Sequence, residues 1–177
     1  KYVEADALCK KMQGPYNQSY LPLADLQLEF TGLDAPTNYR RELNLDTAIA
    51  TTTFQSSATT FTREVFASAP DQLIVLRLTA KGPQKLNLTA TLSSPLRSRS
   101  QADGPNGLQL TGKAPAHVDP NYFRTPNPIV YDEAEGKGMR FACLLQAKAD
   151  GGRVTTKGDR LLIEDASAVT LQFSAAP

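Results

Sequence analysis

The sequence predicts an all-β domain, an antiparallel sandwich of two stacked sheets with one short N-terminal helix. Three observations support this: many short segments alternate apolar and polar residues with period two, turn-forming residues separate them, and only one segment has helical spacing. Short strands at such spacing, with almost no helix between them, are typical of an antiparallel sandwich or barrel, of which we expect the sandwich. A chain of 177 residues is long enough for one such domain, residues 1–177, to bury a core.

The expected helix covers residues 2–12. Val3, Ala7 and Leu8 recur there at helical spacing, and two lysines near the C-terminal end suit the helix dipole. A Gly-Pro pair at residues 14–15 predicts that the helix ends there.

The period changes to two in residues 25–30, where Leu26, Leu28 and Phe30 alternate with polar residues. The same alternation recurs in residues 47–54, 60–68, 73–80, 85–92, 108–112, 138–149 and 168–175. Residues 150–165 contain two glycine turns and predict a pair of hairpins.

Residues 113–137 follow neither period and carry four prolines and the single histidine, His117. A loop of this length in a compact domain is usually functional or disordered. Its aromatic residues, Tyr122, Phe123 and Tyr131, argue against a solvated linker. We therefore expect an ordered excursion that packs on another part of the protein.

The charge balance argues against a nucleic-acid partner. Nineteen basic residues oppose eighteen acidic ones, a formal net charge of +1, and the basic residues are scattered. No apolar run reaches the roughly 18 residues of a membrane span. The glycine-rich pieces are hairpin turns without the following residues of a phosphate loop, and no cofactor is expected.

The chain has two cysteines, which lie far apart in the sequence without metal-ligand spacing, and a single histidine. These residues argue against a zinc or copper site built from this chain, and we expect no metal. Cys143 falls on the same predicted strand face as Met139, Phe141 and Leu145, which favours a buried thiol acting as a small hydrophobe. If the protein is exported, a disulfide between Cys9 and Cys143 is an alternative that the sequence does not decide.

No catalytic residue is assigned. Glycoside hydrolysis needs two carboxylates held apart across the scissile bond, but most acidic residues here alternate with apolar ones and belong to solvent-facing positions. Asp119 and Asp132 are kept as exceptions because they share the long loop with His117. No serine has the glycine pattern of a nucleophile elbow, and a lone histidine more often has a structural role.

Five motifs occur in order: "MQGPYNQSYLPLADLQLEF", "YRRELNLDTAIATTTF", "FTREVFASAPDQLIVLRLTA", "GKAPAHVDPNY" and "GKGMRFACLLQAK". Together they resemble the N-terminal β domain, a supersandwich-like fold, of glycoside hydrolase family ninety-five, the inverting α-L-fucosidases. The resemblance runs from about Tyr2 to the last residue. One departure is Ala24, where the family motif has glycine.

The resemblance implies a longer parent enzyme in which this β-sandwich precedes an (α/α)6 barrel that carries the catalytic acid and base. None of those positions is matched here, so the chain is expected to be a piece of the N-terminal domain, starting after the family's first strands, and inactive alone. The expected substrate is terminal fucose, or a related sugar, on glycans. The expected location is extracellular or periplasmic, in a bacterium.

The resemblance also suggests where the domain contributes to the parent enzyme. Asn17 and Gln18, just before the first strand, are candidates for facing the barrel or the substrate cleft. His117, Asn121 and Tyr122 are candidates for the domain interface near the substrate entrance. For Asn17, capping of a local turn is an equally good reading.

Two other functions remain open. An independent carbohydrate-binding module would suit a sandwich, although the chain has no Trp for an aromatic platform and its Tyr and Phe residues fall largely on strand faces. A self-associating module is the third reading, because an unpaired edge strand invites strand addition.

Overall fold

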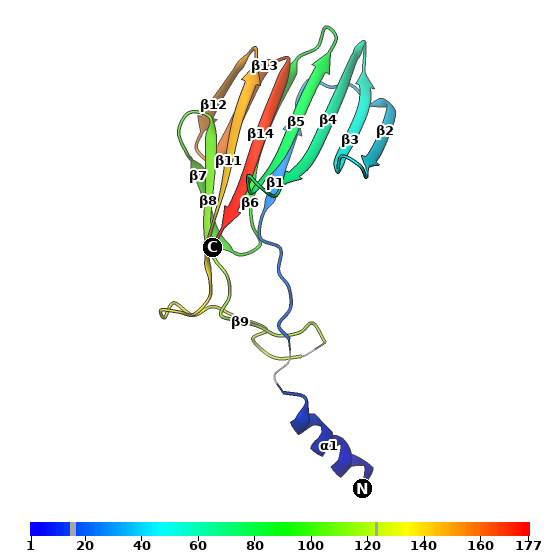
Figure 1. Cartoon of the computed structure of the whole chain (residues 1–177). Coiled ribbons are helices and arrows are strands. Elements are labelled where there is room, and N and C mark those ends of the chain that lie inside the picture. Colours follow the sequence, from blue (N-terminus) through cyan, green and yellow to red (C-terminus); the bar gives the residue numbers. More distant parts are fainter. Residues whose placement is uncertain (15–16, 123) are drawn as a thin grey trace.

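The structure is a computed structural model that describes residues 1–14, 17–122 and 124–177. It confirms two stacked antiparallel sheets and one short helix (Figure 1). The elements are α1 (Tyr2–Met12), β1 (Asp25–Phe30), β2 (Thr37–Asn44), β3 (Ile49–Ser56), β4 (Thr59–Ser68), β5 (Leu73–Lys81), β6 (Leu86–Ser93), β7 (Arg97–Ala102), β8 (Gly107–Lys113), β9 (His117–Val118), β10 (Ile129–Val130), β11 (Arg140–Asp150), β12 (Arg153–Lys157), β13 (Arg160–Ala166) and β14 (Ala168–Ala176).

The larger sheet has eight strands in the order β2-β3-β4-β5-β14-β11-β8-β7, and the smaller has four in the order β1-β6-β13-β12. A two-stranded ribbon, β10-β9, lies within the long loop. Of the two hairpins expected over residues 150–165, only β12–β13 is present. The other expected hairpin is wrong, because the turn at residues 151–152 carries the chain from β11 in the larger sheet to β12 in the smaller one. Strands β1, β2, β7 and β12 form the sheet edges.

The core lies between the two sheets and is built by strict alternation along the strands. In β6 every second residue is buried, from Leu86 to Leu92, and in β11 the buried set includes Phe141, Cys143 and Leu145. Because alternate residues of a strand point to opposite faces, each strand gives one face to this core. The prediction of a buried Cys143 is confirmed, and burial raises the pKa of its thiol.

One detail of that prediction is wrong, and the disulfide that the sequence left undecided is not formed. Met139 precedes β11 and is 60% exposed, so it does not share the buried face of Phe141 and Leu145. Cys9 is exposed on α1 while Cys143 is buried in the sandwich, and both thiols are free, so the two cysteines form no disulfide.

Strands β2 and β7 were not expected from the sequence. Every residue of β2 is exposed, and none of β7 is buried. Both are edge strands that cover little apolar surface, so the alternation that marks the other strands is missing. Their backbones are held by pairing with β3 and β8.

The larger sheet extends beyond the smaller one on the side of β2 to β5. There Arg63 of β4 points to the inner face, with its guanidinium 4.5 Å from the ring centroid of Phe30 and 5.3 Å from that of Phe54. Partial burial lowers the pKa of Arg63. The arginine thus closes the side of the core where the smaller sheet ends, through contacts of its cation with two aromatic rings.

Helix α1 projects away from the sandwich and has no buried residue (Figure 1). The chain then returns to the sandwich, where Leu21 and Leu23 pack against the core and the backbone oxygen of Leu23 accepts a hydrogen bond of 2.6 Å from the Ser94 hydroxyl. These contacts anchor the entry of the chain into β1. Within the described part of the chain, no helix has the length and apolarity that crossing a membrane requires.

Candidate functional site

The two segments that carry the candidate residues, residues 17–19 and residues 117–122, lie side by side, although about 100 residues separate them in the sequence. The side-chain oxygen Oε1 of Gln18 accepts a hydrogen bond of 2.9 Å from the amide of Val118. The Ser19 hydroxyl donates to the backbone oxygen of Asp119 at 2.9 Å, and the Ser19 amide donates to the backbone oxygen of Val118 at 3.4 Å. Gln18 and His117 therefore belong to one local structure.

Strand β10 supports the other side of β9. The Asp119 amide donates to the Pro128 backbone oxygen, and the Ala116 amide donates to the Val130 backbone oxygen, both at 2.8 Å. Residues 18–19, β9 and β10 thus form a small three-segment ribbon at the end of the sandwich from which α1 projects (Figure 1). The prediction that the long loop is ordered and packs on another segment is confirmed for its described residues.

His117 forms a hydrogen-bonded cluster with Asp119 and Thr125. Its Nε2 lies 2.8 Å from Oδ1 of Asp119, and the Thr125 hydroxyl donates to Oδ2 of the same carboxylate. These bonds, that from Thr125 first and that from His117 second, lower the pKa of Asp119. The Asp119 side chain is 17% exposed and that of His117 is 51% exposed. The carboxylate therefore holds the imidazole in place while the ring stays accessible.

Asp132 serves a different purpose. Its carboxylate accepts a hydrogen bond of 2.9 Å from the amide of Ala134, and its backbone oxygen accepts one of 2.6 Å from the ammonium group of Lys113. The first contact closes a local turn, as aspartate often does. The structure therefore gives Asp132 a structural role rather than a place in a catalytic set with His117.

Lys113 and Tyr131 fix the returning part of the loop to the sandwich. The Lys113 side chain is only 11% exposed, and its ammonium group also lies 3.2 Å from the Glu133 carboxylate. The Tyr131 hydroxyl accepts a hydrogen bond of 3.2 Å from the Arg97 amide, and the Arg97 guanidinium lies 4.1 Å from the centroid of the Tyr131 ring. Sequence reasoning missed Lys113 and Ser19, because no local pattern distinguishes them from exposed polar residues.

The remaining candidates lie on the surface. Asn17, Asn121 and Tyr122 are exposed, Tyr122 by 68%. Neither asparagine side chain makes a hydrogen bond with another described residue, so the capping role considered for Asn17 has no support. Phe123, which follows Tyr122 in the sequence, and Tyr16, which precedes Asn17, lie outside the described residues.

Among the described residues, half of the exposed large apolar side chains lie in the same region, which we call the pole: α1, residues 17–20, residues 113–122 and residues 124–137. On α1 the exposed apolar residues are Tyr2, Val3, Leu8 and Met12, and on the rest of the pole they are Tyr20, Tyr122, Ile129 and Val130. An 11-residue helix with no packing partner is marginally stable in water. Eight exposed large apolar side chains at one end of the molecule favour an interaction site there.

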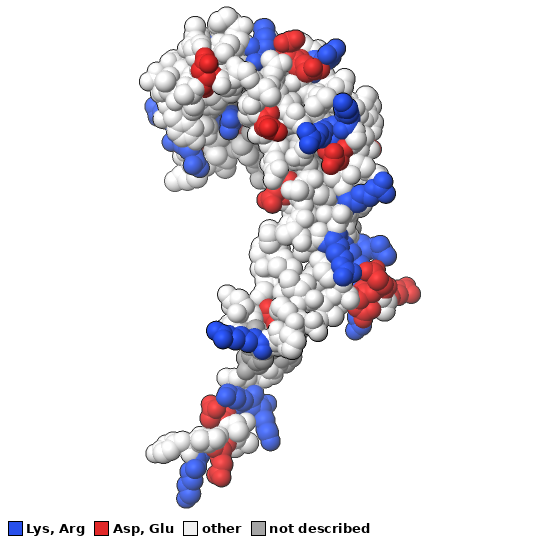
Figure 2. Space-filling view, turned by 180° about the vertical axis from the view of Figure 1, so that it is seen from behind, with Lys and Arg blue, Asp and Glu red and all other residues white. Residues whose placement is uncertain are grey.

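Charged side chains are arranged differently. Figure 2 shows acidic and basic groups interspersed over the face that it presents, rather than gathered into one field. Among the described residues no three His, Cys, Asp or Glu side chains are grouped so that they could hold a metal ion. What the pole offers is therefore an apolar contact surface with an accessible, oriented imidazole, His117.

Comparison with known proteins accounts for this architecture. The whole chain, residues 1–177, matches the family described as "Glycosyl hydrolase family 65, N-terminal domain". The chain belongs to this family. It is similar to "Alpha-L-fucosidase 2" of Arabidopsis thaliana, with 31% identity over 182 residues that cover 99% of this chain and 22% of the plant protein.

Two fungal relatives match shorter stretches. "Probable alpha-fucosidase A" of Aspergillus oryzae is 37% identical over 75 residues, which are 42% of this chain and 9% of that protein. The protein of the same name from Aspergillus niger is 39% identical over 66 residues, which are 37% of this chain and 8% of that protein. The chain spans only about a fifth of the plant relative, and the resemblance to the N-terminal domain of fucosidases is confirmed.

Proposed function

We propose that the chain is the non-catalytic N-terminal domain of an inverting α-L-fucosidase-like glycoside hydrolase, and that its pole packs against the catalytic (α/α)6 barrel. The observation that carries the proposal is the contrast between a closed core and a helix that exposes four large apolar side chains and buries no residue. A helix of 11 residues gains most of its stability from packing, and its exposed apolar side chains favour a partner that covers them. The share of the plant relative that lies outside the match leaves room for such a partner within one polypeptide.

The chemistry of the pole supports a non-catalytic role. An inverting glycosidase needs a general acid and a general base about 6.5–9.5 Å apart, the acid with a raised pKa. Asp119 has the opposite property, because two hydrogen bonds stabilise its ionised form and lower its pKa. The carboxylates of Asp132 and Glu133 accept hydrogen bonds from Ala134 and Lys113, so these two groups act as structural acceptors.

The proposed substrate of the parent enzyme is terminal fucose, or a related sugar, on glycans, and the proposed location is extracellular or periplasmic. At the border of the barrel, His117, Asn121 and Tyr122 would contribute polar and aromatic contacts near the substrate entrance. Gln18 would act indirectly, since its side chain holds the amide of Val118 beside His117.

The test is hydrolysis of 2'-fucosyllactose by the 177-residue chain and by a parent chain that includes the barrel, with reducing-sugar detection. We expect activity in the long chain only. Activity in the 177-residue chain would contradict the proposal and return Asp119 and His117 to consideration as catalytic groups.

A variant of the parent tests the contact at the entrance. His117→Ala should reduce kcat/KM about 2- to 10-fold, the effect of one lost hydrogen bond. The matched control is Arg41→Ala, which removes an exposed side chain of edge strand β2 and should leave kcat/KM unchanged. Unchanged kcat and KM in His117→Ala would remove this residue from the entrance.

A further inference from the structure

Two rows of side chains cross strands β7, β8 and β11 on the outer face of the larger sheet. The first row joins Arg97, Lys113 and Arg140, which are register partners on the three neighbouring strands. Residues paired across antiparallel strands share a face, and this face is opposite to the one that buries Leu110 and Cys143. Three cations therefore lie in one row on the outer face.

The second row, one alternation further along, joins Arg99, Thr111 and Ala142. This row adds a fourth cation, Arg99, diagonal to Lys113. It also places two small side chains, Thr111 and Ala142, on the neighbouring strands β8 and β11. By strand spacing, the Cα atoms of Arg99 and Arg140 are about 12 Å apart, within the combined reach of two extended arginine side chains.

The positive charge of this group is only partly compensated. Like charges directly opposite each other on neighbouring strands are destabilising. Glu133 lies 3.2 Å from the ammonium group of Lys113 and 3.8 Å from the guanidinium of Arg97. In the described part of the chain, the side chains of Arg99 and Arg140 make no ion pair and no hydrogen bond.

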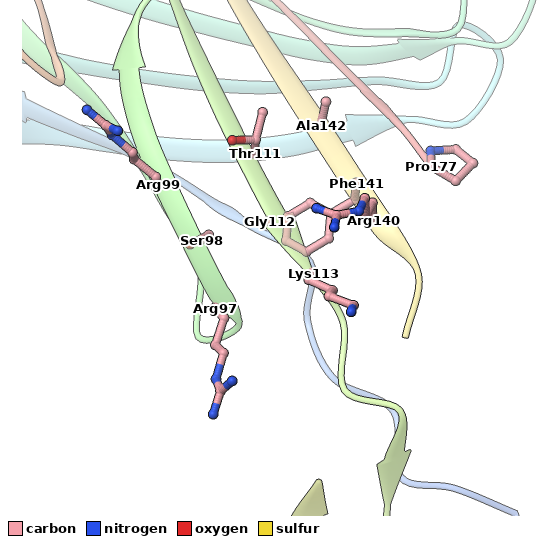
Figure 3. A pocket seen from close by; sticks show the side chains of 10 residues that line it. All are labelled: Arg97, Ser98, Arg99, Thr111, Gly112, Lys113, Arg140, Phe141, Ala142 and Pro177. Atoms are coloured by element: carbon pink, nitrogen blue, oxygen red, sulfur yellow. The ribbon is translucent and has the colours of Figure 1, made fainter. Parts of the chain in front are cut away.

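The same residues line a surface hollow of about 570 Å³ (Figure 3). Figure 3 shows that its lining comes from all three strands, with Arg99 on β7, Thr111 on β8 and Arg140 on β11. The hollow is shallow and open to solvent, so it can contact a charged substituent from one side rather than enclose a whole ligand. The small residues in the second row leave this space open. In Figure 3 the Arg140 side chain lies toward Gly112, whereas that of Arg99 extends away from β8, so Arg99 must change rotamer to meet an anion beside Arg140.

We propose that this hollow binds an oxyanion group, held chiefly by Arg99 and Arg140. Planar guanidinium groups bind carboxylate, sulfate and phosphate through paired hydrogen bonds. In a domain of a glycan-acting enzyme, the source of the anion is a sulfate or uronate substituent of a saccharide, and this choice of source rests on the proposed function above. The binding itself is independent of hydrolysis and is tested on the 177-residue chain.

The experiment is a titration of the labelled chain followed by NMR, at constant ionic strength, with sodium sulfate, sodium phosphate, glucuronate, galactose 6-sulfate and uncharged galactose. We expect saturable shifts of the Arg99, Thr111 and Arg140 signals with the anions and none with galactose. The double variant Arg99→Gln/Arg140→Gln should weaken binding at least tenfold. The matched control, Arg41→Gln on β2, removes an exposed arginine of the opposite sheet edge and should leave binding unchanged.

The outcomes separate the possible sources. Tighter binding of galactose 6-sulfate or glucuronate than of inorganic sulfate and phosphate supports a saccharide-borne anion, whereas the reverse order supports the anion site and overturns the saccharide as its source. Shifts that do not saturate, or that the double variant retains, overturn the proposal. A second readout is thermal unfolding without added anion, in which Arg140→Gln should raise Tm because it relieves the repulsion from Lys113.

Discussion

The sandwich and the pole are built in opposite ways. In the sandwich, alternate residues of facing strands are almost completely buried, and Leu145, Leu161 and Val169 have no exposed surface. In the pole, α1 has no buried residue, and the ribbon is held mainly by hydrogen bonds from Gln18, Ser19 and backbone amides. One region is closed by its own side chains, and the other presents apolar groups to its surroundings.

This difference separates stability from function. Apolar burial provides most of the folding free energy of a domain, so the sandwich carries its stability. The pole contributes little to that burial but contains eight exposed large apolar side chains and the oriented imidazole of His117. Substitutions in the two regions should therefore affect different measurements, and the predictions that follow compare matched changes in each.

The largest effect is expected from truncation of a core leucine. Leu145→Ala on β11 should lower the free energy of unfolding of the 177-residue chain by about 2–5 kcal/mol, through lost burial and the cavity left behind. Leu8→Ala on α1, where the side chain is 63% exposed, should change it by less than about 0.5 kcal/mol. Urea denaturation measures both, and similar losses for the two variants would contradict the division between sandwich and pole.

A glycine pair gives the next largest difference. Gly152, between β11 and β12, has a φ of +65°, and a Cβ there would lie 2.1 Å from the backbone oxygen of Glu164. Gly136 of the pole has a φ of +73° but no atom within 4 Å of such a Cβ. Both Ala variants incur the left-handed backbone cost of about 1–2 kcal/mol, and only Gly152→Ala adds steric overlap of roughly 1–3 kcal/mol.

The readout for the glycine pair is again the free energy of unfolding in urea. Gly152→Ala should be the more destabilising of the two by at least about 1 kcal/mol. Equal losses would mean that the turn between β11 and β12 relaxes to accept a side chain.

The smallest effect is a pH dependence confined to the pole. Because hydrogen bonds from Thr125 and His117 lower the folded-state pKa of Asp119, its contribution to stability is full above the unfolded value of about 3.9. That contribution is lost as the pH falls through the folded-state pKa. Amide exchange, corrected for intrinsic rates, should show protection of Val118 and Asp119 decreasing below about pH 4 while β11 stays protected.

Asp119→Asn is the control for this prediction, since its side chain does not ionise. In this variant the protection of the ribbon should no longer depend on pH in that window. Loss of protection below pH 4 in the variant, or its retention in the native chain, would show that another group controls the ribbon.

Sequence reasoning predicted the parts of the fold that periodicity encodes. Helix α1 was expected over the residues where it is found, and the alternation in β1, β6 and β11 identified strands whose inner faces form the core. β2 and β7 were missed because edge strands with sequences such as "TNYRRELN" and "RSRSQA" bury no face, so their structure depends on the neighbouring strand.

The site was predictable only in part. Gln18 and His117 were both named from the resemblance, but their proximity depends on a hydrogen bond between Gln18 and Val118, residues that are 100 positions apart. No local pattern encodes such a contact. The burial of Lys113 was missed for the same reason, because it results from the loop folding back to place Asp132 and Glu133 over the end of β8.

The central claim is that the pole is an interface with the catalytic barrel, and hydrogen–deuterium exchange tests it most directly. The 177-residue chain and the parent enzyme should be compared peptide by peptide. We predict that α1 and the ribbon exchange rapidly in the short chain and become strongly protected in the parent, while β6, β11 and β14 exchange alike in both. Equal, rapid exchange of α1 in both proteins would contradict the claim.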